Sequence, residues 1–335
     1  MRRVFTSLLI LIFVGALLSF GAALWWLNEP IPLRLVPGSQ VVDLEIEPGT
    51  PASGVADVIV ASGADVPAIF LHAWFRFSGQ GRLIKAGSYE LAPGTTPQKL
   101  LSMLVRGDQA LKSVTLVEGW TFNQVRAALQ KAEQLAPDTL GLAPETIMQK
   151  LSKPGVHPEG RFFPDTYTYA KGSSDLAVLK RAARAMDKRL DAAWALRSPD
   201  TPLKTPDEAL ILASIVEKET GKPSDRSQIG GVFTNRLRLG MLLQTDPTVI
   251  YGLGDKFDGN LRKRDLLADT PYNTYTRAGL PPTPIAMPGK AALLAAVQPA
   301  PTKAIYFVAR GDGSSHFSSS LDEHNRAVNK YIRGQ

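Results

Sequence analysis

The chain has 335 residues, of which 44% are hydrophobic and 21% charged, and it carries no cysteine. This length suits one large domain or two smaller ones, each with a hydrophobic core, and the missing cysteines exclude disulfides, thiolate nucleophiles and zinc–thiolate sites. The net charge of +7 is compatible with an anionic partner, but no dense Lys/Arg block or nucleic-acid-binding motif accompanies it, so we predict no nucleic-acid partner.

The N-terminal segment predicts a membrane anchor. Residues 1–3 contain two arginines, and residues 4–27 carry no charge. As a helix of about 36 Å, this stretch is long enough to cross a hydrocarbon core of roughly 30 Å. Trp25 and Trp26 lie where an interfacial aromatic belt is expected, and the arginines favour a cytoplasmic N-terminus with the remaining chain outside. The alternative is a cleaved signal peptide, although no convincing cleavage site precedes the tryptophans.

After a linker over residues 28–40, one pattern recurs in the region 41–156. A short alternating strand is followed by a glycine turn, a threonine at or beside the helix start, and an amphipathic helix. Three stretches follow it: "LEIEPGTPASGVADVIVASG", "GSYELAPGTTPQKLLSMLVRG" and "VTLVEGWTFNQVRAALQ". These units resemble LysM-like glycan-binding modules, and the alternative is a generic α+β subdomain with repeated turn chemistry.

An aromatic segment over residues 157–174 leads into the last region of the chain, 157–335. Its rings either close a hydrophobic core, which we favour, or stack on sugars. They are Phe162, Phe163, Tyr167 and Tyr169. A long helix is predicted next, over residues 175–196, from the helical spacing of its apolar residues.

A second helix, predicted over residues 206–220, ends in two carboxylates. Thr205 and Pro206 form a strong helix start, and the helix is apolar almost all round, which indicates burial. Glu217 and Glu219 lie two residues apart and therefore point about 200° away from each other. The negative end of the helix dipole and apolar neighbours both raise a carboxyl pKa, as a general acid requires. The alternative is that both glutamates are solvated residues at a helix end.

Polar side chains gather downstream of this helix. A helix is predicted over residues 225–241, capped by Ser224, and Asp246 is predicted as the N-cap of a short helix that follows. A proline-stiffened loop then spans residues 270–289. Amides and phenols suit carbohydrate, although Asp246 could serve only as a cap. The candidate substrate-binding residues are Gln244, Thr245, Asp246, Tyr251, Asn273 and Tyr275. His316 and His324 are interpreted as structural residues or as peripheral binders. No metal-binding motif occurs. We predict neither a metal nor an organic cofactor.

Several stretches together resemble one family over essentially the whole chain. They are "EGRFFPDTY", "ASIVEKET", "NRLRLGMLLQTDPTVIYG", "YNTYTRAGLPPTPI" and "YFVARGDGSSHFSSSLDEHN". They are similar to the YceG-like family, the endolytic murein (lytic) transglycosylases called MltG. The family usually has a glycine after "GLPP", where this chain has Thr283.

The resemblance implies an α+β protein with an N-terminal transmembrane helix, a LysM-like α/β subdomain and a mixed α+β catalytic domain. It implies an inner-membrane enzyme with a periplasmic body, acting on nascent glycan strands and cooperating with peptidoglycan synthases. Such an enzyme cleaves the MurNAc–GlcNAc β-1,4 bond without water and leaves a 1,6-anhydro end. The family's essential acid matches Glu219, with Glu217 as a supporting or alternative acid. The other hypotheses are a hydrolytic muramidase and a non-catalytic, membrane-anchored glycan-binding scaffold.

Overall fold

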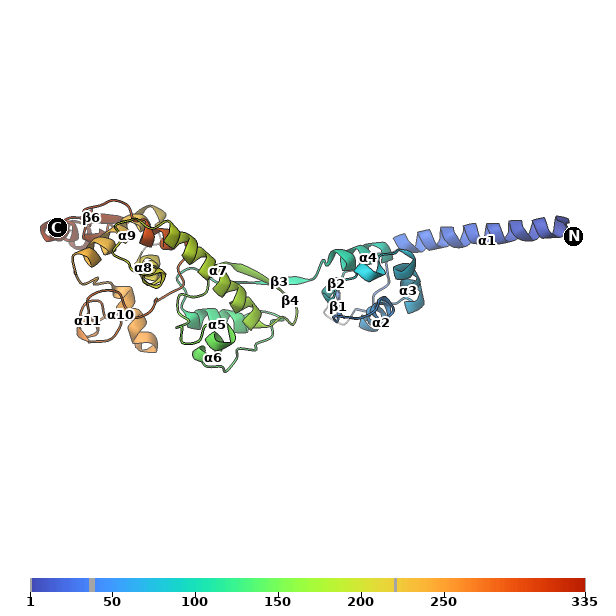
Figure 1. The fold of residues 1–335 in the computed structure, drawn as a ribbon, viewed down its shortest axis with the longest axis horizontal. Coiled ribbons are helices and arrows are strands. Elements are labelled where there is room, and N and C mark those ends of the chain that lie inside the picture. Colours follow the sequence, from blue (N-terminus) through green and yellow to red (C-terminus); the bar gives the residue numbers. More distant parts are fainter. Residues whose placement is uncertain (1, 36–39, 220–221, 335) are drawn as a thin grey trace. The chain divides into compact units, whose positions relative to one another are not determined.

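A computed structural model describes residues 2–35, 40–219 and 222–334, without the side chains of residues 2–10 and 12. The chain divides into two compact units, Met1–Lys112 and Ser113–Gln335, which are described separately (Figure 1). Helices and short antiparallel strands are mixed throughout, so the predicted α+β class is confirmed.

The first unit combines a helical N-terminus with a strand–helix–helix–strand arrangement. Strands β1 and β2 pair antiparallel from Val42↔Leu91 to Ile46↔Gly87. Alternate residues of β1 are buried, so one face of this two-stranded sheet covers the core and helices α2 and α3 pack nearby. The elements are α1 (Arg2–Asn28), β1 (Val42–Ile46), α2 (Ala52–Ser62), α3 (Ala68–Phe77), the 3-10 turn η1 (Gly81–Leu83), β2 (Gly87–Leu91) and α4 (Pro97–Arg106).

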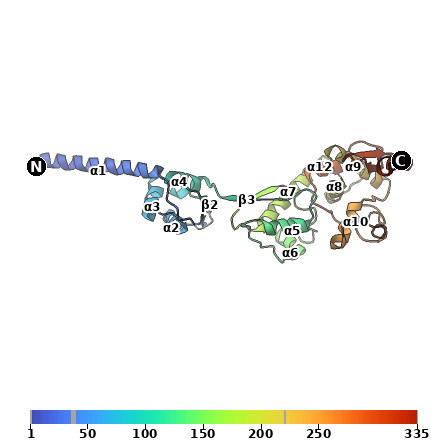
Figure 2. The same ribbon diagram turned by 180° about the vertical axis from the view of Figure 1, so that it is seen from behind.

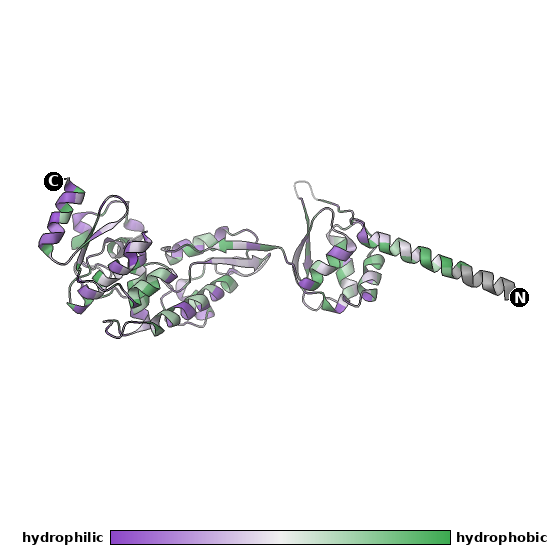
Figure 3. Ribbon diagram, turned by 90° about the horizontal axis from the view of Figure 1, so that it is seen from above, coloured by the Kyte–Doolittle hydropathy of each residue, from purple (hydrophilic) through white to green (hydrophobic). Residues whose placement is uncertain are grey.

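Helix α1 covers the segment for which we predict a membrane span. Among the residues that the structure describes, no helix is both long and apolar enough to cross a membrane. The predicted span over residues 4–27 falls partly on side chains outside the described part. Figure 3 colours only the remaining part of α1, which is mostly green or pale, the colours of hydrophobic and intermediate residues.

The predicted strand–turn–helix order is confirmed three times along the chain. It is found in β1 and α2, in β2 and α4, and in β3 and α5. The turn glycines Gly49, Gly94 and Gly119 all have positive φ, a conformation that favours glycine because it has no Cβ. The compact units divide at residue 112, so the third repeat lies in the second unit and the region 41–156 does not coincide with one unit.

The second unit holds the helices on which the candidate site is built (Figures 1 and 2). Its two two-stranded sheets pair β3 with β4 and β5 with β6, and β3 begins just before the unit boundary. The elements are β3 (Leu111–Thr115), α5 (Phe122–Lys131), α6 (Pro144–Lys150), β4 (Thr166–Ala170), α7 (Asp175–Ala195), α8 (Pro206–Glu219), α9 (Pro223–Arg238), α10 (Asp246–Leu253), the 3-10 turn η2 (Gly254–Lys256), α11 (Lys263–Leu267), α12 (Lys290–Val297), β5 (Tyr306–Ala309), β6 (Ser315–Ser318), α13 (Leu321–Val328) and the π-helical turn η3 (Asn329–Arg333).

Helix α8 is the centre of this unit. Its residues 209–216 are all buried, and α7, α9 and α12 pack around it. The predicted start is confirmed, because the Thr205 hydroxyl accepts a hydrogen bond from the Glu208 amide at 3.2 Å. An apolar helix enclosed by three others has a fixed position, so its last turn presents Glu217 and Glu219 from a rigid support.

A second apolar cluster joins α5, α6 and α7 to the aromatic segment. Phe162, Tyr167 and Tyr169 are buried in it, and Phe163 is buried in the cluster around α8. The two tyrosine hydroxyls donate to backbone carbonyls of Phe163 and Glu133. The preference for a core role over sugar stacking is therefore confirmed.

Two predicted helix starts are wrong. Helix α9 begins at Pro223 with Lys222 at its N-cap, and the Ser224 hydroxyl bonds to the Asp225 side chain instead of capping. Helix α10 has Thr245 at its N-cap, with Asp246 as its first residue. The N-cap lies two residues earlier than predicted in α9 and one residue earlier in α10, and in both helices a proline occupies the first or second helical position, where its fixed φ suits the first turn.

Candidate active site

One cavity of about 410 Å³ collects polar side chains from segments that are far apart in the sequence. They come from the end of α8, from α9, from the segment before α10, from the loop after α11, from β5 and from α13. The polar lining residues are Glu219, Arg236, Gln244, Asp246, Tyr275, Tyr306 and His324. Four of the predicted site residues, Glu219, Gln244, Asp246 and Tyr275, are thus brought together.

The Glu219 carboxyl is half-buried in this cavity and accepts a hydrogen bond from the Thr245 hydroxyl through Oε1. Burial raises the pKa of Glu219, and the nearby Asp246 charge raises it further. The Thr245 hydrogen bond and the Arg236 charge act in the opposite direction. The net effect is a raised pKa, which is the direction that a general acid near neutral pH requires.

Thr245 is not a free cavity residue but a buried support for Glu219. It is 2% exposed, and its amide donates to the Thr274 hydroxyl at 3.1 Å. The Thr248 hydroxyl donates to the Thr245 carbonyl at 2.8 Å and lies 2.9 Å from the Thr274 hydroxyl. This closed polar network fixes the Thr245 hydroxyl, and so fixes the orientation of the Glu219 carboxyl.

The residue before Thr245 has an unusual backbone. Gln244 has φ of 51°, in the left-handed region that residues other than glycine rarely adopt. Its amide donates to the Thr274 carbonyl at 3.1 Å, and its side-chain oxygen lies 3.4 Å from an Arg236 nitrogen. The strained backbone turns the chain so that Gln244 lines the cavity while Thr245 faces Glu219.

Asp246 and Tyr275 form a pair on the cavity wall. The Tyr275 hydroxyl donates to Asp246 Oδ1 at 2.6 Å. Burial, together with this hydrogen bond and the Asp246 charge, raises the Tyr275 pKa, so the phenol stays protonated. Asp246 is not the helix cap, so its carboxylate remains available to a ligand. The Tyr275 phenol holds this carboxylate toward the cavity.

Arg236 supplies a buried positive charge that the sequence analysis missed. It is 8% exposed and donates to the carbonyls of Ile305 and Leu243 at 2.7 and 2.9 Å. Its guanidinium also lies 5.1 Å from the Tyr306 ring centroid. The sequence contains two arginines in the "NRLRLG" stretch, but nothing in it shows which of them points inward.

His324 also lines the cavity. Its ring stacks on Tyr306 at 5.1 Å between centroids, with the planes 23° apart. Burial lowers the His324 pKa, and the charges of Arg236 and His316 lower it further, which favours the neutral imidazole. Within the described residues, its buried Nδ1 has no hydrogen-bond partner.

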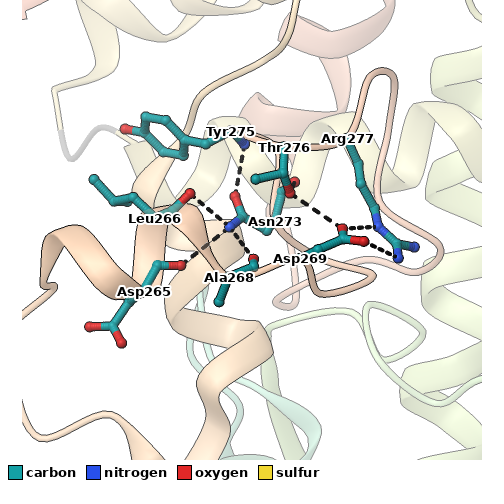
Figure 4. A network of polar contacts seen from close by, with 8 residues as sticks. All are labelled: Asp265, Leu266, Ala268, Asp269, Asn273, Tyr275, Thr276 and Arg277. Atoms are coloured by element: carbon teal, nitrogen blue, oxygen red, sulfur yellow. Dashed lines mark hydrogen bonds and ion pairs between the residues drawn. The ribbon is translucent and has the colours of Figure 1, made fainter.

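Asn273 is fully buried and organises the loop that carries Tyr275 (Figure 4). Its side-chain nitrogen donates to the carbonyls of Asp265, Leu266 and Ala268 at 3.2, 3.0 and 2.6 Å. Its side-chain oxygen accepts from the Tyr275 amide at 2.9 Å. Because both ends of the amide are used inside the protein, the structure places Asn273 behind the cavity wall rather than at a ligand.

Tyr251 points away from the Glu219 cavity. Its hydroxyl donates to Glu159 Oε2 at 3.1 Å, and its ring meets Tyr272 edge-on at 4.9 Å. Glu159 is only 3% exposed, and burial raises its pKa to about 7. These groups border a second cavity, and the sequence analysis did not single out Glu159.

Both carboxyl oxygens of Glu217 have partners within the protein. Its Oε2 accepts from the Gly289 amide at 2.8 Å, at the start of α12, and its Oε1 lies 3.4 Å from an Arg226 nitrogen. Burial raises the pKa of Glu217 as it does that of Glu219, so the pKa alone does not distinguish the two. The cavity does distinguish them, because Glu219 lines it and Glu217 does not. This is the divergence expected for residues two apart on a helix.

The groups in the Glu219 cavity suit acid–base chemistry on a polar ligand. Across the described part of the chain, no group of three His, Asp or Glu residues is arranged to hold a metal ion. The protein's own groups supply a proton donor, a second carboxylate, a buried cation and stacked rings.

The chain is similar to proteins named for action on murein. The family model described as the YceG-like family matches residues 44–330. An endolytic murein transglycosylase of Bacillus subtilis (strain 168) is 30% identical over 308 residues, which cover 87% of this chain and 85% of that protein. One of Streptococcus pneumoniae serotype 2 is 28% identical over 287 residues, covering 75% of this chain but 51% of that protein.

A solved structure gives the same assignment at the level of the fold. The crystal structure of a YceG-like protein from Listeria monocytogenes has a TM-score of 0.53 and 27% sequence identity. The match covers 86% of this chain and 99% of that one. With the family model matching most of its length, the chain belongs to the YceG-like family.

Proposed function

We propose that this protein is an endolytic lytic transglycosylase that cleaves the MurNAc–GlcNAc β-1,4 bond of nascent glycan strands. The observation that carries the proposal is the half-buried Glu219 carboxyl, whose pKa is raised, facing a cavity that it shares with Asp246 and Tyr275. The names of the Bacillus and Streptococcus relatives support the reaction.

In the proposed reaction, one carboxyl group acts twice. Glu219 protonates the glycosidic oxygen while the bond from that oxygen to C1 breaks. The resulting carboxylate removes a proton from the C6 hydroxyl of the muramic sugar, whose oxygen bonds to C1. The product carries a 1,6-anhydro end, Glu219 regains its proton, and no water is consumed.

Neighbouring groups have separate roles in this scheme. The Asp246 carboxylate, held by Tyr275, faces the positive charge that develops at C1. Arg236 and Thr245 stabilise the charged form of Glu219 between the two proton transfers. Gln244 and His324 line the same cavity and contact the sugars.

A muramidase is the second candidate, because Asp246 places a second carboxylate in the cavity. In that reaction, Asp246 would act on water or on C1, and the product would have a reducing end. The two reactions differ by one water in the mass of the product.

The N-terminal part of the proposal concerns location. We infer that residues 4–27 anchor the chain in the inner membrane, with the N-terminus cytoplasmic and the catalytic region periplasmic. The lack of charge over these residues supports the anchor, as do the exposed side chains of Leu11, Phe13 and Trp25, which are 73%, 64% and 66% exposed. Retention in the membrane pellet after alkaline carbonate extraction is expected, and release into the supernatant would count against the anchor.

Residues 41–156 supply the proposed LysM-like glycan binding. The β1–α2–α3–β2 order in this region, with the two strands paired antiparallel, supports this assignment. Cooperation with peptidoglycan synthases belongs to the same proposal and rests on the resemblance of the sequence alone.

Product analysis with matched variants tests the reaction. The full-length protein in detergent is incubated with uncrosslinked glycan strands, and products are identified by mass spectrometry. We expect anhydro products from the wild type, a loss of at least about 100-fold in Glu219→Gln, and retained activity in Glu217→Gln. An active Glu219→Gln variant overturns the assignment of the acid. Reducing-end products from the wild type indicate the muramidase, and binding without cleavage indicates a scaffold.

A further inference from the structure

A second cavity, of about 610 Å³, lies at the other end of α10 from Asp246. The first residue of α10 lines the Glu219 cavity, whereas Tyr251 and Gly254, at and beyond its last turn, line the second one. At 1.5 Å of rise per residue, the 8 residues of α10 separate the two cavities by on the order of 12 Å. One extended polymer can therefore reach both.

The lining of the second cavity is polar and aromatic and contains no lysine or arginine. Its side chains combine three phenyl or phenol rings, the His157 imidazole, two amides and three carboxyl groups. Such a surface disfavours anionic ligands. Carboxylates and amides are partners for hydroxyl groups, and aromatic faces are partners for pyranose rings. The lining side chains suited to contact a sugar are Asn123, Gln124, Glu159, Tyr251, Phe257 and Tyr272.

The wall of this cavity is already assembled. Glu159 accepts from the Phe122 amide at 3.0 Å and from the Tyr251 hydroxyl at 3.1 Å. Tyr272 packs edge-on against Tyr251, and its hydroxyl lies 2.9 Å from the Thr283 hydroxyl. Thr283 is the residue that replaces the family's usual glycine, so here it helps to fix one of the rings.

Other lining groups remain available to a ligand. Asn123 is exposed, and its side-chain amide forms no hydrogen bond with another described residue. Phe257 is partly exposed at the start of the segment after η2. A rigid wall with an accessible amide and ring in its lining is the arrangement of a preformed sugar subsite.

We infer that the second cavity binds a neutral sugar unit of the same glycan strand that is cleaved at Glu219. The inference rests on the proposed function. Because the lining carries carboxyl groups and neither lysine nor arginine, the unit held there is the sugar without a carboxyl substituent. Binding at this subsite adds contacts that only a strand long enough to span α10 can make, so it favours long strands over short fragments.

The test compares substrates of two lengths in the full-length protein. One variant combines Asn123→Ala with Phe257→Ala, and its control combines Asn260→Ala with Leu267→Ala, which are exposed residues outside the lining. The substrates are peptide-free glycan strands and the shortest fragment that the wild type cleaves. We expect kcat/KM on long strands to fall about tenfold in the cavity variant only, with the fragment unaffected. An equal loss on both substrates, or no loss on either, overturns the subsite.

A binding measurement separates this inference from the proposed reaction. Glu219→Gln, with and without the cavity substitutions, is tested for co-sedimentation with peptide-free strands. About tenfold weaker binding on adding the cavity substitutions supports the subsite even if the wild type cleaves nothing. Unchanged binding, or an effect seen only with strands that still carry peptides, contradicts a neutral-sugar site.

Discussion

Replacing Glu159 by glutamine probes a buried carboxyl whose ionisation the fold opposes. Burial raises the pKa of Glu159 from 4.5 to about 7, against the opposing effect of hydrogen bonds from Tyr251, Phe122 and Gly160. Between these two pH values the folded protein holds a proton that the unfolded chain has lost. Since the folded state then binds more protons, the free energy of unfolding falls as the pH rises through this window.

The size of the change in the free energy of unfolding follows from the rise in the pKa of Glu159. A difference of about 2.5 pH units, at roughly 1.4 kcal/mol for each unit, corresponds to about 3 kcal/mol. This contribution is fully present below pH 4.5 and is lost above pH 7. Glutamine has nearly the same shape and can still accept from the Phe122 amide, but it cannot ionise. We therefore expect Glu159→Gln to resemble the wild type near pH 4.5 and to exceed its stability by about 3 kcal/mol at pH 8.

Urea unfolding of the full-length protein at several pH values between 4.5 and 8 measures this difference. Pulsed hydrogen exchange of peptides from α5, α7 and α10 reports the second unit separately from the first. Tyr251→Phe is the matched variant, because it keeps the carboxyl and removes a hydrogen bond that favours its charged form. The loss of stability should extend to higher pH in Tyr251→Phe, and the pH dependence should weaken in Glu159→Gln. A stability difference between wild type and Glu159→Gln that does not change with pH would refute this reasoning.

Three further predictions concern the active-site region. Thr245→Val removes a hydrogen bond to the charged form of Glu219, so the pKa of Glu219 rises further and the alkaline limb of the kcat/KM profile moves to higher pH. Asn273→Ala leaves buried carbonyls without a donor and should lower the free energy of unfolding by about 3 kcal/mol, measured by urea unfolding. At Gln244, whose φ is positive, glycine should match or raise the stability by about 1 kcal/mol, whereas valine should lower it by about 2 kcal/mol, measured in the same way.

Each of these predictions has its own control. Thr245→Ser keeps the hydroxyl, so an equal shift of the alkaline limb in the serine and valine variants would contradict the role of the hydrogen bond. Asn273→Asp keeps the acceptor but not the donors, and wild-type stability in that variant would contradict the network in Figure 4. Equal stabilities of the glycine and valine variants at Gln244 would show that its backbone is not strained.

Local chemistry determined most of the elements of this protein. Thr205, followed by proline and an apolar run, specifies the start of α8 because a cap and a fixed φ act within one turn. The glycine turns between strand and helix depend on φ values that glycine favours, and their repetition was visible as a pattern. The angle between Glu217 and Glu219 also followed from the sequence, since helix geometry alone sets it.

Only the tertiary structure decided which side chains meet. Glu219 faces a cavity and Glu217 faces Gly289, because α12 packs on one side of α8. Arg236 and His324 come from helices that periodicity could predict, yet their convergence depends on how those helices pack around β5. The role of Asn273 was likewise hidden, since an amide in a loop looks the same in sequence whether it binds a ligand or the loop itself. Hydrogen-bond and dihedral preferences act over a few residues, whereas the burial that places a charge in a cavity depends on contacts between segments far apart in the chain.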